Sequence, residues 1–193
     1  MDLILASASP RRAELLNILG VKFTKLPVDA DESFDNNMTA SETVIELSKR
    51  KALKAAAIDK GDNIIIACDT VVSLDGIIMG KPSSEDDAFS MLRALSGRTN
   101  EVWSGIAAVY HGRLVAESVC TKVRFRELSD EEIQRYIDSG EPFDKAGAYG
   151  IQGKASLFVT GIEGQYHNVV GFPVTSLELL LRKEFGMSLY DFT

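Results

Sequence analysis

The chain has 193 residues, of which 45% are hydrophobic and 25% are charged, and its formal net charge at pH 7 is −7. This length can bury a core as one compact unit or as two closely joined lobes. The acidic balance excludes a general nucleic-acid binder and a protein that binds acidic membranes, because both present basic surfaces. We therefore expect any phosphate site to be local and built from a few focused cations.

The two cysteines, Cys68 and Cys120, are too few for a disulfide framework and favour a reducing, cytosolic compartment. The N-terminus lacks the basic region of a signal peptide, and no stretch approaches about 18 consecutive apolar residues. We expect neither a leader nor a membrane span. With only two histidines, a zinc cage is not expected, so any metal would be a hard cation held by carboxylates.

The N-terminus predicts a strand that leads directly into a helix. Residues 3–6 are apolar, and Ser9 followed by Pro10 is typical of an N-cap and a first helical position. We expect the helix to end near residue 19 and to face a core with Leu15, Leu16, Ile18 and Leu19. The helix N-terminus and the guanidinium groups of Arg11 and Arg12 favour a bound phosphate. Alternatively, the serine and proline merely cap a helix and the arginines are solvated.

The next segments predict a second strand over residues 21–26, an acidic loop over residues 28–37 and a long helix. Thr39 is the expected cap of that helix, which reaches about Ile58. Residues 63–74 give the strongest strand signal, because residues 64–68 form a continuous apolar run, as in a strand buried on both faces. Asp75 and Gly76 then predict a hairpin turn.

The second half of the chain mixes hairpins with helices. We expect a helix over residues 85–96, capped by Ser83 or Ser84, extended segments over residues 99–110 and 113–126, and a helix opened by a capping box at Ser129. A glycine-rich loop over residues 144–154 leads to short strands near residues 157–160 and 165–170 and to a last helix over residues 174–185. This pattern predicts an α/β fold with a mixed sheet, as one domain over residues 1–193.

Asp69 is the first candidate for chemistry, because it directly follows the buried apolar run. A carboxylate is costly to bury unless it is paired or binds a metal, and ligand sites gather where strands end in α/β sheets. Alternatively, Asp69 begins a turn or accepts local backbone N–H bonds. Against this, Thr70 and the two valines after it continue as strand and offer no turn.

Three lysines and one glutamine extend the candidate site. Lys51 shares a helical face with apolar residues and so points toward a cleft, although its neighbouring lysines would ordinarily form a solvated face. Lys81, between a glycine and a proline, can reach a phosphate or a carboxylate but does not belong to a Walker A loop. The glycine-rich loop carries Asp144, Lys145 and Gln152, and the glutamine amide can read a base edge through its paired donor and acceptor.

Together these residues suit the hydrolysis of a phosphoanhydride. They comprise cations for phosphates, acids for a hard metal or a water, and an amide for a base: Arg11, Arg12, Lys51, Lys81, Lys145, Glu32, Asp69, Asp144 and Gln152. Such chemistry consists mostly of charge neutralisation and the positioning of an attacking water. A free aspartate, with a pKa of about 3.9, is a weak base at pH 7. A metal that lowers the pKa of the bound water makes this water easier for such a base to deprotonate.

Five motifs in this order resemble the Maf family of nucleoside triphosphate pyrophosphatases: Ser7-Ala8-Ser9-Pro10-Arg11-Arg12, Cys68-Asp69-Thr70, Gly80-Lys81-Pro82, Leu95-Ser96-Gly97 and the run from Asp144 to Gly153. The resemblance spans nearly the whole chain. It implies a house-cleaning enzyme that cleaves a nucleoside triphosphate to the monophosphate and diphosphate with Mg²⁺ or Mn²⁺. It also implies a fold related to the inosine triphosphate pyrophosphatases, with a strongly twisted sheet and two lobes around a cleft.

The resemblance also implies roles for single residues. Asp69 matches the general base or metal-linked acid, with Glu32 as a second metal ligand, and the phosphate-binding positions match Ser7, Arg12, Lys51, Lys81 and Lys145. Members that act on dTTP and UTP resemble this chain at Arg11, Thr70 and Gln152, whereas the branch acting on 7-methyl-GTP tends to have tryptophan, glutamine and glutamate there. A glutamine amide can satisfy the carbonyl groups and the N–H of thymine or uracil.

Two alternatives stay open. In the first, the chain is an enzyme whose substrate is 7-methyl-GTP or a modified pyrimidine triphosphate. In the second, it is a nucleotide-binding regulator of septum formation without important catalysis. Binding alone would need the cations and the amide but not Asp69. We expect a cytoplasmic protein with a small-molecule nucleotide as its partner and with neither nucleic acid nor membrane as partners. The family resemblance implies a homodimer and a link to cell-division arrest.

Overall fold

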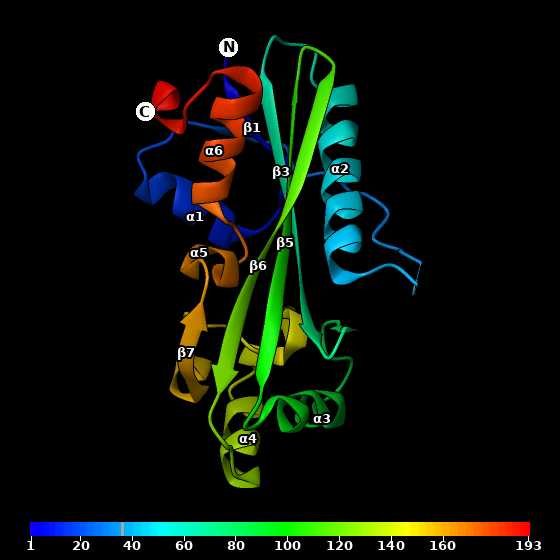
Figure 1. Ribbon diagram of the computed structural model, residues 1–193, viewed down its shortest axis with the longest axis vertical. Coiled ribbons are helices and arrows are strands. Elements are labelled where there is room, and N and C mark those ends of the chain that lie inside the picture. Colours follow the sequence, from blue (N-terminus) through cyan, green and yellow to red (C-terminus); the bar gives the residue numbers. More distant parts are fainter. Residues whose placement is uncertain (36) are drawn as a thin grey trace.

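A mixed sheet with helices on both faces forms the centre of the computed structural model, which describes residues 1–35 and 37–193 (Figure 1). Over these residues the sheet has seven strands in the order β2-β1-β3-β5-β6-β7, and β4 pairs with β3 outside this path. β1 runs parallel to β2 and β3, and the other pairs are antiparallel. The strands are β1 (Leu3–Leu5), β2 (Thr24–Lys25), β3 (Ile64–Leu74), β4 (Ile77–Met79), β5 (Thr99–Tyr110), β6 (Arg113–Phe125) and β7 (Val159–Glu163).

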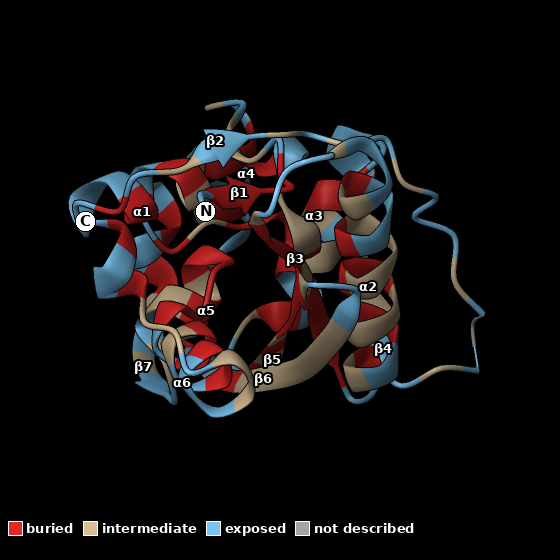
Figure 2. Ribbon diagram, turned by 90° about the horizontal axis from the view of Figure 1, so that it is seen from above, coloured by how far each residue is buried: buried red, intermediate tan, exposed pale blue. Residues whose placement is uncertain are grey.

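The helices form two layers and one end cap. α2 covers one face of the sheet, and α1, α5 and α6 lie on the other face (Figure 2), while α3 and α4 lie at one end of the long strands (Figure 1). Their bounds are α1 (Pro10–Ile18), α2 (Ala40–Ile58), α3 (Glu85–Leu95), α4 (Asp130–Ile137), α5 (Tyr166–Val170) and α6 (Val174–Phe185). Short 3₁₀ helices are η1 (Glu141–Asp144), η2 (Ala146–Ala148), η3 (Lys154–Phe158) and η4 (Leu189–Phe192).

The apolar run of β3 is buried on both faces, as predicted. Ile65 and Ala67 pack into the core beneath α2, whereas Ile64, Ile66 and Cys68 pack into the core shared with α1 and α6. Successive side chains of a strand point to opposite faces, so a strand between two helical layers must be apolar at every position. The predicted α/β fold with a mixed central sheet flanked by helices is confirmed.

α2 lies unusually close to the sheet at Gly105 of β5. A Cβ atom at this position would lie only 2.0 Å from the main-chain oxygen of Val44 in α2. The helix begins with the predicted cap, since the Thr39 side chain accepts a hydrogen bond from the Glu42 N–H and the Glu42 carboxylate accepts one from the Thr39 N–H. The glycine and the cap together fix where the α2 side chains meet the sheet.

Several predictions about the elements are wrong. The strand predicted near residues 165–170 is wrong, because Tyr166–Val170 form α5. The Asn168 side chain of this helix donates hydrogen bonds to the main chain of β5 and β6, and such tertiary contacts override local preference. Ile18 and Leu19 are 72% and 43% exposed, because α1 contacts the core only through its Ala13, Leu15 and Leu16 side. The strand predicted over residues 21–26 is reduced to the two residues of β2.

The loop predicted over residues 28–37 includes position 36, which lies outside the described residues. Among the residues described, no helix combines the length and the apolar character needed to cross a membrane. The single domain over residues 1–193 stays a prediction.

Candidate active site

A cavity of about 910 Å³ opens beside the middle of β3. β1 pairs with β3 only as far as Leu5 opposite Ile66, and beyond that point the chain turns away into α1. The volume lies within the range of small-molecule sites, roughly 300–1,000 Å³. The cavity walls contain every predicted site residue: Ser7, Arg11, Arg12, Glu32, Lys51, Asp69, Thr70, Lys81, Asp144, Lys145 and Gln152.

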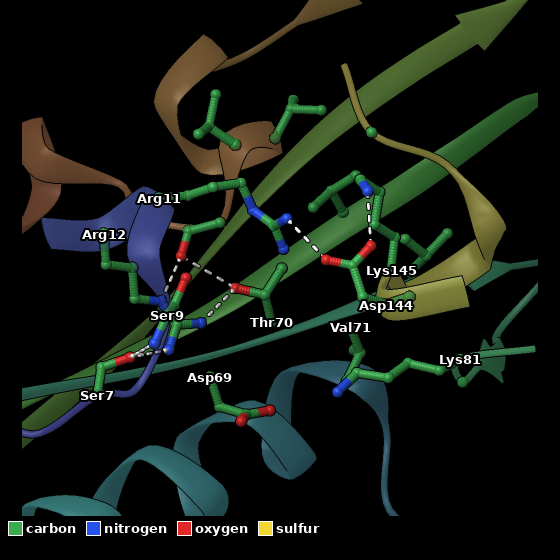
Figure 3. Close-up of a pocket in the computed structure, with 18 of the residues that line it drawn as sticks. Ser7, Ser9, Arg11, Arg12, Asp69, Thr70, Val71, Lys81, Asp144 and Lys145 are labelled. Carbon is green, nitrogen blue, oxygen red and sulfur yellow. Dashed lines mark hydrogen bonds and ion pairs between the residues drawn. The ribbon is translucent and has the colours of Figure 1, made fainter. Parts of the chain in front are cut away.

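Asp69 and Thr70 are neighbours in β3 and therefore point to opposite faces of the sheet. The Asp69 carboxylate faces α2, where it meets Lys51, whereas the Thr70 hydroxyl faces the layer of α1 and α5 and bonds to Ser104 at 2.8 Å. In Figure 3 the two side chains lie on different sides of the strand. The cavity reaches both because β1 no longer covers this edge of β3.

Lys51 joins the two carboxylates that the sequence singles out. Its Nζ lies 2.5 Å from Asp69 Oδ1 and 2.8 Å from Glu32 Oε1, and the side chains of Lys51 and Asp69 are each only 13% exposed. Burial by itself lowers the pKa of Lys51, but the charge of Asp69 and the bonds to both carboxylates outweigh it and raise the pKa above 10.5. The bond from Lys51 lowers the pKa of Glu32 below 4.5, so the pair stays charged at neutral pH.

A divalent cation fits this acidic corner only with help from a substrate. Mg²⁺ prefers one or two carboxylates completed by water and phosphate oxygens, and Glu32 and Asp69 converge on a single point, which the Lys51 ammonium holds here. Among the described residues no group of three or more histidine, cysteine or acidic side chains is placed to hold a metal ion. The donor set therefore suits a cation that arrives with a phosphorylated ligand.

Arg12 is engaged almost completely by the protein itself. Its guanidinium donates to the carbonyl oxygens of Gly171 at 2.9 Å and Cys68 at 2.6 Å, and to the hydroxyls of Ser7 at 3.1 Å and Thr70 at 3.3 Å. An arginine side chain has five N–H donors, so the bonds within the described residues leave a single N–H on Nη2 for a ligand. Arg12 binds the free edge of β3 where β1 has ended.

Ser7, not Ser9, organises the start of α1. The Ser9 side chain makes no capping bond, which differs from the prediction, although Ser9 is the residue that precedes the helix. The buried Ser7 hydroxyl instead accepts bonds from the Ser9 N–H at 3.2 Å and from Arg12. The hydroxyl oxygen thus accepts from two protein donors, and within the described residues its own O–H stays free to face a phosphate.

Arg11 reaches across the cavity to the opposite wall. Its guanidinium lies 3.4 Å from Asp144 Oδ2, and the other Asp144 oxygen accepts a 2.6 Å bond from Lys145 (Figure 3). Burial by itself raises the pKa of Asp144. The bond from Lys145 and the charges of Lys145 and Arg11 outweigh burial, so the pKa of Asp144 lies below 3.8. One carboxylate therefore holds two predicted ligand-binding cations from two separate segments.

Lys81 and Gln152 remain available to a ligand. Both side chains are exposed at the cavity wall, and neither forms a side-chain hydrogen bond or ion pair within the described part of the chain. In Figure 3 the Lys81 side chain comes from the side of the cavity opposite Arg11. Among the described residues, the site thus offers the free ammonium group of Lys81 and the free amide of Gln152.

Three residues of the site were missed by reasoning from the sequence: Ser104, Gly171 and Glu141. The Gly171 carbonyl accepts bonds from Arg12 and Thr70, and a φ of +102° favours glycine there. The glycine before Phe172 and Pro173 is the only signal that the sequence offers there, and by itself it does not indicate a site. Ser104 and Glu141 carry no local signal, because their roles depend on strand register and loop folding.

The fold and the site define a class of protein: an α/β enzyme with a cavity ringed by cations around a half-buried aspartate-lysine pair, suited to a phosphorylated small molecule. A sequence model of the family described as Maf-like protein matches residues 2–184. The chain belongs to the Maf family, as its five motifs predict.

Curated relatives support this membership. A protein named dTTP/UTP pyrophosphatase from Caldicellulosiruptor bescii is 45% identical over 94% of this chain and 94% of its own length. Another of that name from Thermococcus gammatolerans is 49% identical over 89% of this chain and 91% of its own. Among solved structures, the Ham1 protein of Staphylococcus aureus aligns with 65% of this chain and 72% of its own, at 15% identity and a TM-score of 0.45.

Proposed function

We propose that this protein is a nucleoside triphosphate pyrophosphatase that hydrolyses dTTP and UTP to the nucleoside monophosphate and diphosphate. The observation that carries the proposal is the aspartate-lysine pair of Asp69 and Lys51 inside a cavity that also presents Arg11, Lys81 and Lys145. The relatives named dTTP/UTP pyrophosphatase, at 42–49% identity, support the substrate class.

The residues of the cavity divide into a phosphate end, an acidic corner and a base end. Lys81 presents a free ammonium group to the triphosphate, and positive charge that is fixed before the reaction stabilises the charge that develops on the phosphate oxygens. Asp69 is placed to hold an attacking water and accept its proton, and the bond from Lys51 orients this carboxylate. A divalent cation held by Glu32 and Asp69 would neutralise phosphate charge and acidify the water.

Gln152 and Arg11 form the base end in this proposal. The Gln152 amide has no protein partner within the described part of the chain, so its oxygen and its NH₂ group can pair with the N–H and a carbonyl group of uracil or thymine. Arg11 forms an ion pair with Asp144, which lies on the same glycine-rich loop as Gln152. A cationic purine such as 7-methylguanine would favour a carboxylate at position 152 instead.

A substrate panel tests the proposal. Purified protein with Mg²⁺ or Mn²⁺ is given dTTP, UTP, CTP and 7-methyl-GTP, and diphosphate release is measured. We expect dTTP and UTP to be preferred, and Asp69→Asn to lower turnover by at least about 100-fold, as for the loss of a general base, with nucleotide binding retained. Preference for 7-methyl-GTP would contradict the base assignment. Binding without diphosphate release by the wild type would favour a nucleotide-binding regulator.

The cytoplasmic location, the homodimer and the link to septum formation belong to the same proposal as expectations from the family. Sedimentation of the purified protein tests the homodimer directly. The location and the link to septum formation are tested by cell fractionation and by the division phenotype of cells that overproduce the Asp69→Asn variant, because a regulator that only binds nucleotide would still arrest division.

A further inference from the structure

Glu141 contacts both the segment that carries Lys145 and the segment that carries Gln152. We propose that Glu141 is a positioning residue: its carboxylate fixes the turn that presents Gln152 and thereby sets how well the enzyme distinguishes one pyrimidine base from another. This inference rests on the proposed function.

The carboxylate of Glu141 is folded against the turn that carries Gln152. Its Oε2 accepts a 3.2 Å hydrogen bond from the main-chain N–H of Lys154, and a Cβ atom placed on Gly153 would lie 1.9 Å from Oε1. Gln152 is thus followed directly by two residues against which the Glu141 carboxylate lies. The φ of Gly153 is −108°, so glycine is needed there for space and not for an unusual backbone conformation.

A buried tyrosine anchors the carboxylate from the other side. The Tyr136 hydroxyl of α4 donates a 3.2 Å bond to Glu141 Oε1, and the tyrosine ring is 3% exposed and packs edge-on against Phe158 at 5.2 Å. Each carboxylate oxygen therefore accepts from one donor, Oε1 from Tyr136 of α4 and Oε2 from the turn. The arrangement ties the turn to the core, although Gln152 itself is exposed.

The link from Glu141 to Lys145 is of a different kind. The Lys145 ammonium donates a 2.7 Å bond to the main-chain oxygen of Glu141, and its side chain lies across Gly150, where a Cβ atom would come within 2.6 Å of Lys145 Cε. Substitution of the Glu141 side chain leaves that main-chain acceptor in place. Changes at the Glu141 side chain should therefore affect the base end of the site and spare the phosphate end.

A double-mutant cycle with Gln152 tests the proposal. The measured quantity is the ratio of kcat/KM for UTP to kcat/KM for CTP, two nucleotides that differ in the pairing edge of the base. We expect Glu141→Ala to lower this ratio about fivefold, the effect of losing one neutral hydrogen bond between the Gln152 amide and the base. Gln152→Ala should lower it by a similar factor, and the double variant should lower it no further, because both changes remove the same contact.

Two further variants keep the result from depending on a single substitution. Glu141→Gln retains the shape and one acceptor for the Lys154 N–H, so the ratio should return most of the way to the wild-type value. Gly153→Ala pushes the carboxylate away from the opposite side and should lower the ratio as Glu141→Ala does. Glu163→Ala, an exposed glutamate at the end of β7 outside the cavity, is the matched control.

The outcomes separate the two proposals. If the wild type releases no diphosphate from UTP, the proposed function fails. If the wild type prefers UTP to CTP but Glu141→Ala lowers kcat/KM for both alike, with a lower melting temperature and an unchanged ratio, Glu141 is only a structural residue and the inference is overturned. The inference also fails if the effects of Glu141→Ala and Gln152→Ala on the ratio multiply in the double variant.

Discussion

At the scale of single residues, Lys51 decides the electrostatics of the acidic corner. Asp69 is 13% exposed, and a carboxylate so little exposed needs a nearby cation or strong hydrogen bonds. Lys51 supplies both to Asp69 and also holds Glu32, whose side chain is 66% exposed. Removal of the ammonium would leave two carboxylates facing the same point without a cation.

The first prediction concerns the variant Lys51→Met. The pKa of Glu32 is lowered in the folded protein, so Glu32 adds stability above pH 4.5 that is lost as the pH falls through the pKa of the folded state. The pKa of Lys51 is raised in the folded protein, so Lys51 adds stability below pH 10.5 that is lost as the pH rises through the pKa of the folded state. We expect the variant to be less stable than the wild type at pH 7 and the difference to shrink toward both pH extremes. Denaturant unfolding from pH 3 to pH 11 measures it.

Lys49→Met is the matched control for this prediction. Lys49 lies on the same helix and forms no side-chain hydrogen bond or ion pair within the described residues. Its replacement should shift the unfolding free energy by a nearly constant amount at all pH values. A difference between wild type and Lys51→Met that did not depend on pH would contradict the ion-pair account.

At the scale of elements, the contact between α2 and β5 places Lys51 over the sheet. Gly105 is the register partner of Asp69 and allows the Val44 carbonyl of α2 to approach. Val44 and Lys51 are seven residues apart and so lie on the same face of the helix. The glycine on one strand thus brings the lysine of the helix to the aspartate on the next.

The second prediction is the effect of Gly105→Ala. The added methyl group would have to displace the α2 backbone, and overpacking of this kind costs about 1–3 kcal/mol of unfolding free energy. Turnover should fall as well, since the displacement separates Lys51 from Asp69. Urea unfolding and diphosphate release measure the two effects.

Gly80→Ala serves as the stability control, because a Cβ atom there has open space around it. We expect it to change the unfolding free energy by less than about 0.5 kcal/mol. Gly105→Ala with wild-type stability would show that α2 does not depend on this contact for its position.

At the scale of the whole molecule, Arg12 connects three parts that are distant in the sequence. From α1 it bonds to the main chain of β3 at Cys68 and to Gly171 between α5 and α6. Hydrogen bonds to a charged group contribute about 1.5–3 kcal/mol each when they are well formed. Arg12 therefore stabilises the assembly of the cavity walls in addition to any contact with a phosphate.

The third prediction compares Arg12→Lys with Lys81→Ala. A lysine cannot reproduce the planar fork of the guanidinium, so we expect Arg12→Lys to lose about 2 kcal/mol of unfolding free energy and much of the activity. Lys81 is exposed and unpaired within the described residues, so Lys81→Ala should keep wild-type stability and lower turnover for every base alike. Thermal unfolding and the substrate panel measure both. A base-dependent loss in Lys81→Ala would place this lysine at the base end.

The sequence predicted the elements whose pattern is local. The continuous apolar run predicted β3, and the capping residues predicted the starts of α2, α3 and α4, because these signals arise between neighbouring residues. The prediction of a strand at α5 is wrong, because this helix is held by bonds from Asn168 to β5 and β6 that the local sequence does not show. Long-range hydrogen bonds of this kind leave no periodic signal in the chain.

By itself the sequence determined the family, the mixed α/β architecture and the residue types of the site, because motifs and apolar periodicity are properties of the chain. Only the tertiary structure decided which of these residues bind other protein groups and which are available to a ligand. It showed that Arg12 is mostly bound by the protein itself, that Lys51 joins Asp69 to Glu32, and that Lys81 has no side-chain partner among the residues described. The reason is physical: which donor meets which acceptor depends on sheet register and on where β1 ends, and neither is a property of any short segment.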